Sequence, residues 1–479
     1  MNALSQDEVS AILALYAAGM AQSLDDATLH HTKRILVDSI AVAIGALDHP
    51  AASVARRFAE ASPALEGGSL VWGTSRRATP DTAALVNGVL MRCYDFNDIA
   101  IGRMGGGHPS DMVPGLIAAA EWRNLSGIEL LSAMAVGYEV LFSLFDSVSS
   151  KEGHWDYTNI TAIGATCAVG RLLGLSAETL SEAVGITATC HLVSDEIESR
   201  ELNRHGDLTM WKRFNGANAV RQGIYSCQLA AAGTEAVVRP FVGRHGFLSR
   251  VTVREGFATW LADKLNPAHA PSRIGGATMK RWPVGSRGQS AIQAAFSARA
   301  ELKDASRIAA VKVLTEEATY DHLVRQQKDP FHPISRETAD HSLPYIVAVA
   351  LLDGQIESES FDLDRISAVK EAGLLERMTV TSAPRAELGS FAASSDTAKG
   401  FLTRLEIRTT DGATVVGEAL PPPGHPAAPL SDKDLSEKLL ECAKGRLDAA
   451  DKLLDCLWSA ERHPARSITA ALASAQPRG

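Results

Sequence analysis

The chain has 479 residues, of which 46% are hydrophobic and 22% charged, the profile of a globular protein with more than one domain. Its net charge of -9 disfavours a nucleic-acid partner, because binding to phosphates needs a basic surface. The six cysteines form no C-x-x-C pair and match no zinc or iron–sulfur spacing, so we expect reduced thiols, no metal and no other cofactor.

The N-terminus carries no sign of a targeting segment. Its first ten residues, MNALSQDEVS, are partly acidic and lack the apolar stretch of a secretory signal. No apolar run approaches the roughly 20 residues that a bilayer span needs. We therefore expect a cytoplasmic protein without a membrane partner.

The first half of the chain is predicted to be helical throughout. Apolar residues recur at helical spacing over 7–24 and 27–47. Thr79 followed by Pro80 marks another helix start, and we expect this helix to reach Asp95. After a glycine-rich loop, a helix is expected from near Ser110 to 122, and others over 127–147, 161–173, 176–190 and 215–232, with Ser176 as a cap.

After about residue 267 the pattern changes. Strands are predicted over 308–314, 377–383 and 402–420, with Asp411-Gly412 as a hairpin turn, and helices over 288–302, 338–353 and 363–374. The proline-rich segment 421–429 is a linker, and a helical tail follows with Ser431 and Asp434 as a capping pair. The predicted fold is therefore mostly α: an all-helical domain over 1–266, an α+β domain over 267–420, and helices over 421–479 that return to the helical domain.

The densest polar cluster lies at residues 94–111. Asp95 and Asp98 are three residues apart, so both project from one face if the helix continues. His108 precedes Pro109 and Ser110 at an expected helix N-terminus, where free N–H groups favour an anion. This combination suits proton transfer on an acidic substrate, but a capped helix–loop–helix with surface charges has the same residues. The residues alone leave both interpretations open, and the spacing is not a dinucleotide fingerprint.

Four segments together resemble one known family. They are YDFND and GHPSD at 94–98 and 107–111, WKRFNGANAVRQGIYSCQLAAAG at 211–233, MKRWPVGSRGQSAIQAA at 279–295, and RETADHSLPYIVAVALLDG at 336–354. In this order they resemble the MmgE/PrpD family, which includes 2-methylcitrate dehydratase, cis-aconitate decarboxylase and iminodisuccinate epimerase. The resemblance covers nearly the whole chain, and it implies a helical domain with a smaller α+β domain in a homodimer.

The resemblance also implies site residues. The first aspartate of the family's acidic motif corresponds to Asp95, its histidine to His108, and its two pocket lysines to Lys212 and Lys280. We expect the two lysines to hold substrate carboxylates, because an ammonium beside an anion is a strong pair where water is excluded. His108 is the expected acid or base, and Asp95 its orienting partner. Replacing Asp95 by Asn or His108 by Ala should abolish turnover and leave folding intact.

Two positions depart from the family pattern. Ile99 stands where many relatives have a threonine, and Tyr157 stands where many have a histidine, with His154 three residues earlier. We expect Asp98, Ser110, His154, Tyr157 and Tyr320 to contact substrate; Tyr320 and His322 lie where relatives place a pocket tyrosine. His341 is expected on a helix in a structural role.

The predicted activity is that of a metal-independent lyase resembling 2-methylcitrate dehydratase. It abstracts a proton next to a carboxylate of a small di- or tricarboxylate and eliminates water. Ile99 leaves open an epimerase or carbon–nitrogen-bond enzyme acting on an aminopolycarboxylate, like iminodisuccinate epimerase, and also a cis-aconitate-type decarboxylase. A fourth option is a dimeric relative that binds an anion without catalysis. Ile99 and Tyr157 favour this option, whereas the retained Asp95, His108 and two lysines argue against it.

Overall fold

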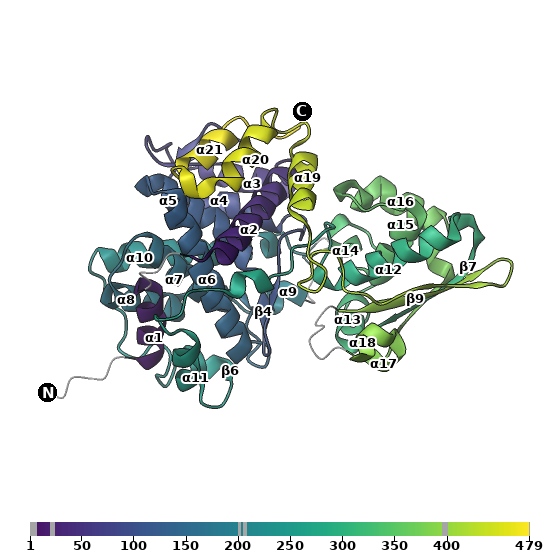
Figure 1. Ribbon diagram of the computed structural model, residues 1–479, viewed down its shortest axis with the longest axis horizontal. Helices are drawn as coiled ribbons and strands as arrows, with labels where there is room; N and C mark the ends of the chain where they lie inside the picture. The colour runs from purple at the N-terminus through teal and green to yellow at the C-terminus, as the bar shows by residue number, and fades with distance from the viewer. Residues whose placement is uncertain (1–6, 20–23, 200–202, 205–207, 395–400, 479) are drawn as a thin grey trace.

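A computed structural model describes residues 7–19, 24–199, 203–204, 208–394 and 401–478. The helical part and the sheet-containing part lie side by side, and the C-terminal segment crosses back onto the helical part (Figure 1). The predicted fold class, mostly helical with a smaller α+β part, is confirmed. The exact domain limits at 266/267 and 420/421 stay a prediction.

The helical part is built around long apolar helices. α10 packs against α4, α7 and α8, and α6 against α7. The helices before residue 280 are α1 (Glu8–Gly19), α2 (Asp26–Gly45), α3 (Pro50–Glu60), α4 (Pro80–Arg92), α5 (Val113–Arg123), α6 (Gly127–Ser147), α7 (Thr158–Leu172), α8 (Ala177–Cys190), α9 (Glu196–Ser199), α10 (Trp211–Ala231) and α11 (Phe257–Lys264). The predicted N-terminal helix over 7–24 thus ends at Gly19, and residues 20–23 lie outside the described part.

The helix α6 is long and apolar enough to cross a membrane, contrary to the expectation that no apolar run approaches the length of a bilayer span. In its most apolar stretch, 83% of the residues are buried inside the protein. The helix packs against α7, α5 and α2. Its hydrophobicity is therefore explained by its place in the core.

The C-terminal tail belongs to the helical core. α19 (Asp432–Ala443) packs on α2, and α20 (Ala450–Trp458) and α21 (Arg466–Leu472) follow it. One hydrophobic cluster includes core residues from Val9 to Met279 and again from Leu430 to Ala475. The capping pair predicted for α19 is confirmed, since Ser431 and Asp434 exchange both bonds of a capping box.

A four-stranded sheet in the order β10-β9-β7-β8 forms the second part. β7 (Ile308–Thr315) pairs parallel with β8 (Met378–Ser382) and antiparallel with β9 (Thr403–Thr409), which pairs with β10 (Thr414–Gly417). The predicted Asp411-Gly412 turn joins β9 to β10, with Gly412 at φ +87°. α12 (Ser286–Leu302) packs on β9, β10 and α15 (Leu343–Asp353), around a separate hydrophobic cluster. The other helices of this part are α13 (Glu317–Tyr320), α14 (Arg336–Ala339), α16 (Leu363–Glu371), α17 (Arg385–Leu388) and α18 (Ser390–Ser394).

Short two-stranded pairs complete the helical part. They are β1 (Ser69–Leu70) with β2 (Arg77–Ala78), β3 (Ala100–Ile101) with β4 (Gly106–Gly107), and β5 (Val148–Ser149) with β6 (Thr252–Val253). The β3–β4 pair contains the glycine-rich loop, which lies against the end of α6. A Cβ atom at Gly102 would lie 2.2 Å from the carbonyl carbon of Phe145, so glycine is needed there for close approach of two backbones.

Candidate functional site

The cluster at 94–111 folds as a turn and not as a continued helix. α4 ends at Arg92, and Asp95 has φ +45°, in the left-handed region that few non-glycine residues adopt. The expectation that Asp95 and Asp98 share one helix face is therefore wrong. Both carboxylates are nevertheless buried, with 6% and 0% of their surface exposed.

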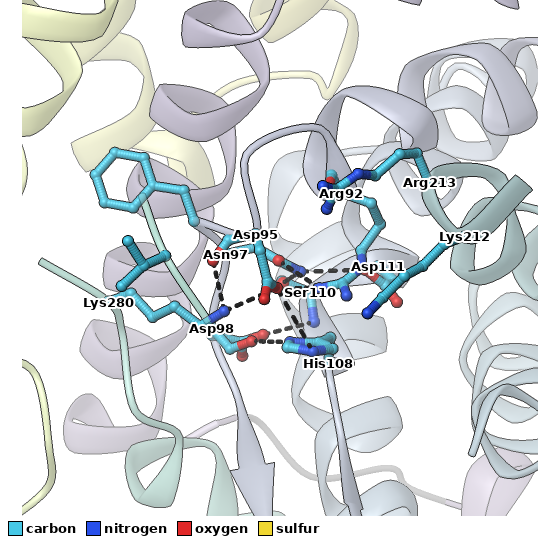
Figure 2. Close-up of polar contacts among 12 residues, drawn as sticks. Arg92, Asp95, Asn97, Asp98, His108, Ser110, Asp111, Lys212, Arg213 and Lys280 are labelled. Carbon is cyan, nitrogen blue, oxygen red and sulfur yellow. Dashed lines mark hydrogen bonds and ion pairs between the residues drawn. The ribbon is translucent and has the colours of Figure 1, made fainter. Parts of the chain in front are cut away.

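Asp95 is held between two cations (Figure 2). Lys280 Nζ donates to Asp95 Oδ1 at 2.9 Å and to the Asp95 carbonyl oxygen at 2.6 Å, and Arg92 Nη1 donates to Oδ1 at 3.0 Å. Burial alone would raise the pKa of Asp95, but Lys280, and then Arg92, outweigh it and hold the pKa well below its usual range. Asp95 is therefore a carboxylate. Lys280 is fully buried and is the counter-ion of Asp95, while its expected contact with a substrate carboxylate stays a prediction.

His108 lies beside this carboxylate with a defined tautomer. Its Nδ1 is 2.5 Å from the carbonyl oxygen of Asp98, which can only accept, so Nδ1 carries the hydrogen. Its Nε2 is 3.9 Å from Asp95 Oδ1, and the ring of Tyr157 meets the imidazole edge-on at 5.7 Å. Burial, Arg92 and Lys280 hold the pKa of His108 well below its usual range, with Asp95 opposing them. At neutral pH His108 therefore presents an unprotonated Nε2.

Asp98 and Ser110 shape the turn that carries His108. Asp98 Oδ1 accepts the Ser110 backbone N–H at 3.1 Å, and its Oδ2 accepts the Tyr138 hydroxyl at 2.7 Å. Asn97 Nδ2 donates to Ser110 Oγ at 3.0 Å and to Asp111 Oδ1 at 3.1 Å. Burial raises the pKa of Asp98 to about 6. Asp98 and Ser110 therefore form hydrogen bonds within the protein, next to the turn that carries His108.

Lys212 reaches the cluster from the first turn of α10, on the side opposite Lys280 in Figure 2. Its Nζ is 3.3 Å from Nε2 of His341. His341 does not lie on a helix as expected. The predicted helix over 338–353 is broken between α14 and α15, because Ser342 caps α15 by accepting the Tyr345 N–H at 3.1 Å and Pro344 lies in its first turn.

A cavity of about 120 Å³ opens between the helical part and the sheet-containing part. Its lining residues are Arg92, Asp95, Ile99, His108, Lys212, Gly285, Ser286, Arg287, His322, Leu323, His341 and Phe401. Three of these residues, Arg92, Lys212 and Arg287, are basic, and Asp95 is the only carboxylate among the lining residues that the structure describes. A cavity of this composition favours a negatively charged ligand.

The cation at the start of α12, Arg287, was not among the site residues predicted from the sequence. Arg287 Nη1 and Ser286 Oγ are buried atoms that have no hydrogen-bond partner within the described residues. The Arg287 guanidinium also lies over the ring of Phe401 at 4.1 Å. The helix dipole disfavours a basic residue in the first turn of a helix. Arg287 in the GSRGQ segment was therefore an indication in the sequence of a site for an anion.

Other predicted substrate contacts lie elsewhere. His154 is exposed in a turn with φ +58°, and Tyr320 packs on the second core with the guanidinium of Arg325 over its ring at 5.2 Å. Neither residue lines the cavity, whereas His322, which was noted beside Tyr320, does. Burial, then Lys212 and Arg287, hold the pKa of His322 well below its usual range.

Known proteins match this chain along most of its length. Residues 11–259 match the MmgE/PrpD N-terminal domain, and residues 282–460 match the MmgE/PrpD C-terminal domain. Cis-aconitate decarboxylase of Homo sapiens is 26% identical over 91% of this chain and 88% of its own length. 2-Methylcitrate dehydratase of Cupriavidus necator is 26% identical over 70% of this chain and 69% of its own, and that of Escherichia coli K12 is 23% identical over 70% and 71%.

Proposed function

The chain belongs to the MmgE/PrpD family, and from this premise we propose that it is a lyase that removes a proton beside a carboxylate of a small di- or tricarboxylate and expels water. Relatives named 2-methylcitrate dehydratase support this reaction, and we take a substrate of that kind as the first candidate. A homodimeric assembly and a cytoplasmic location stay predictions from the sequence.

The observation that carries the proposal is the charge of the cavity. In the described part of the chain, Arg92, Lys212 and Arg287 line it together with one carboxylate, that of Asp95, although the net charge of the protein is -9. Opposite charges about 4 Å apart attract by about 4 kcal/mol at an effective dielectric constant of about 20. Among the described lining residues, positive charges outnumber negative ones, and this excess supports a substrate with more than one carboxylate.

The geometry around His108 supports proton transfer from such a substrate. Its Nε2 takes the proton next to the carboxylate, and Asp95, 3.9 Å away, stabilises the imidazolium that forms. Lys212 and Arg287 hold the carboxylate on which negative charge develops. The electron pair of the broken C–H bond forms the double bond, and the hydroxyl leaves with a proton from a second group.

Ile99 favours a second candidate. Its apolar side chain lines the cavity where many relatives carry a threonine hydroxyl that could bind the leaving group. If no side chain assists a leaving group, the carbanion-like species is reprotonated instead. The reaction is then that of an epimerase acting on an aminopolycarboxylate. Loss of CO₂ from the same species is a third outcome, and the relative that matches 91% of the chain is named cis-aconitate decarboxylase.

The proposal is tested by following formation of the unsaturated acid from 2-methylcitrate and from citrate by ultraviolet absorbance. His108→Gln should lower kcat by about 10²–10⁴-fold and leave KM unchanged, because it removes the base but preserves the shape of the site. His332→Gln is the matched control, since His332 is an exposed histidine that pairs with Asp329. Equal activity of His108→Gln and the wild type would refute the assignment of the base.

A further inference from the structure

The elimination needs a donor for a second proton, and a buried pair of residues in contact with Lys212 indicates which group this is. Asp340 and His341 lie in the break between α14 and α15, with 1% and 4% of their surface exposed. The carboxylate of Asp340 accepts a hydrogen bond from His341 Nδ1, and its other oxygen is 3.5 Å from Arg213 Nη2. This pairing fixes the tautomer of His341, with its hydrogen on Nδ1 and a lone pair on Nε2.

Asp340 is ionised in this arrangement. Burial would raise the pKa of Asp340, but His341, and then Arg213 and Arg336, outweigh it and lower the pKa below its usual value. A buried carboxylate with these partners orients the imidazole and compensates positive charge on it. The pair therefore has the parts of a carboxylate–histidine dyad, and its free nitrogen points to a lysine.

That free nitrogen meets Lys212. Nε2 of His341 is 3.3 Å from Nζ of Lys212, and both side chains line the cavity. A lone pair on Nε2 accepts a hydrogen from the ammonium, which turns the remaining ammonium hydrogens away from His341. An imidazolium at the same place would put two like charges 3.3 Å apart in a buried site, which is unfavourable. The neutral imidazole of His341 therefore acts as a hydrogen-bond acceptor that holds the ammonium of Lys212 in place.

We propose that Asp340 and His341 are positioning residues that hold Lys212 as the general acid of the reaction, so that Lys212 is a catalytic proton donor and not only a carboxylate clamp. This inference rests on the proposed function. His108 Nε2 takes the proton from carbon, the C–O bond breaks, and the leaving oxygen takes a proton from Lys212 Nζ to form water. Lys212 is left as a neutral amine. It regains its proton when the His108 imidazolium returns its own to solvent, so the net change is loss of one water from the substrate.

Other charged and titratable groups surround His341. Asp340, Arg213 and Arg336 lie on its carboxylate side, and Lys212, His322, Arg287 and Asp95 line the cavity with it. The ring centroid of His322 is 6.3 Å from that of His341. The ion pair between Arg213 and Asp340 already links α10 to the segment that carries His341. The contact between His341 and Lys212 is therefore not needed to hold the two segments together.

The test compares His341→Gln with His341→Leu in the full chain. The glutamine oxygen can still accept a hydrogen bond from Lys212, whereas leucine removes the acceptor. We expect His341→Gln to retain most of the wild-type kcat and His341→Leu to lower kcat by about 10²–10⁴-fold with KM unchanged. Asp340→Asn should lower kcat as His341→Leu does, whereas His332→Gln, in the exposed Asp329–His332 pair, should have no effect.

A second measurement does not depend on turnover or on a folded variant. Nitrogen-15 NMR of the wild-type histidines reports which ring nitrogen of His341 carries hydrogen, and Nδ1 is expected. An unprotonated Nδ1, or a His341→Leu enzyme with the kcat of the wild type, would overturn the positioning role of Asp340 and His341. Absence of any unsaturated product with the wild-type enzyme would instead overturn the proposed function, and the NMR result would still decide the tautomer.

Discussion

Replacing Asp95 by Asn tests the charge balance on which the site depends. The side chain of Lys280 is 0% exposed and that of Arg92 is 4% exposed, and both donate to the same oxygen of Asp95. Asparagine keeps the shape, tolerates φ +45° and still accepts a hydrogen bond, so the change removes little except charge. Leaving a buried charge without its partner costs about 3–5 kcal/mol, and we expect a loss of that size in the free energy of unfolding. The sequence-based expectation that folding stays intact is therefore revised.

Urea unfolding followed by circular dichroism measures this loss. Asp411→Asn is the control, because Asp411 pairs with Arg307 at an exposed site and should change stability by less than about 1 kcal/mol. In the double variant Asp95→Asn/Lys280→Met, the removed ammonium no longer needs a partner. Its stability should exceed the sum expected from the two single changes. Strict additivity, or an Asp95→Asn variant as stable as the wild type, would refute the charge-balance argument.

The pH dependence of the same comparison has a defined sign. The folded state lowers the pKa of Asp95 below the ordinary value of about 3.9, so the carboxylate stabilises the folded protein above that pH. This contribution is lost as the pH falls through the lowered pKa. The difference between wild type and Asp95→Asn should therefore be constant near neutral pH and should shrink in acid.

Three further predictions concern the residues around the site. Gly107→Ala would put a Cβ atom 2.5 Å from the ring of Tyr157, so we expect a loss of about 1–3 kcal/mol in urea unfolding and lower turnover. Burial raises the pKa of Asp111 to about 7. The free energy of unfolding of the wild type should therefore fall by up to about 1.4 kcal/mol per pH unit between about pH 4 and 7. Asp111→Asn should lack this slope when unfolding is measured across that range. In the wild type the ammonium of Lys438 lies 2.7 Å from the buried carboxylate of Asp38. Lys438→Met leaves this carboxylate without its partner and should lower the free energy of unfolding by about 3–5 kcal/mol in the same assay. A smaller loss than that caused by breaking an exposed pair would contradict this prediction.

Signals confined to a few neighbouring residues were sufficient for much of the fold. The Ser431–Asp434 capping box, the Ser176 cap and the Asp411-Gly412 hairpin all formed as predicted, because each depends on hydrogen bonds within about four residues. Helical periodicity located the long helices, with ends that differ by a few residues. The family resemblance then supplied the residues of the site, which composition and spacing alone left undecided.

The structure of the site itself depends on contacts between distant segments. Asp95 leaves the helix and adopts a left-handed conformation where its carboxylate meets Lys280, which is 185 residues away in the chain. The sequence around Asp95 holds no signal for that partner. His341 is different, since Ser342 and Pro344 beside it are ordinary start signals of α15 and could have shown that it lies outside the helix. Its contact with Lys212 joins residues 129 positions apart and could not be predicted from local pattern.

The central claim, proton abstraction from a polycarboxylate followed by loss of water, is tested most directly by proton NMR of the purified protein in D₂O. The wild-type enzyme would be given 2-methylcitrate, citrate, cis-aconitate and iminodisuccinate in turn, with and without EDTA. The account predicts an alkene signal from a hydroxy acid that EDTA does not change. Deuterium uptake next to a carboxylate without an alkene would instead establish the epimerase, and no change in any of the four compounds would contradict the proposed reaction.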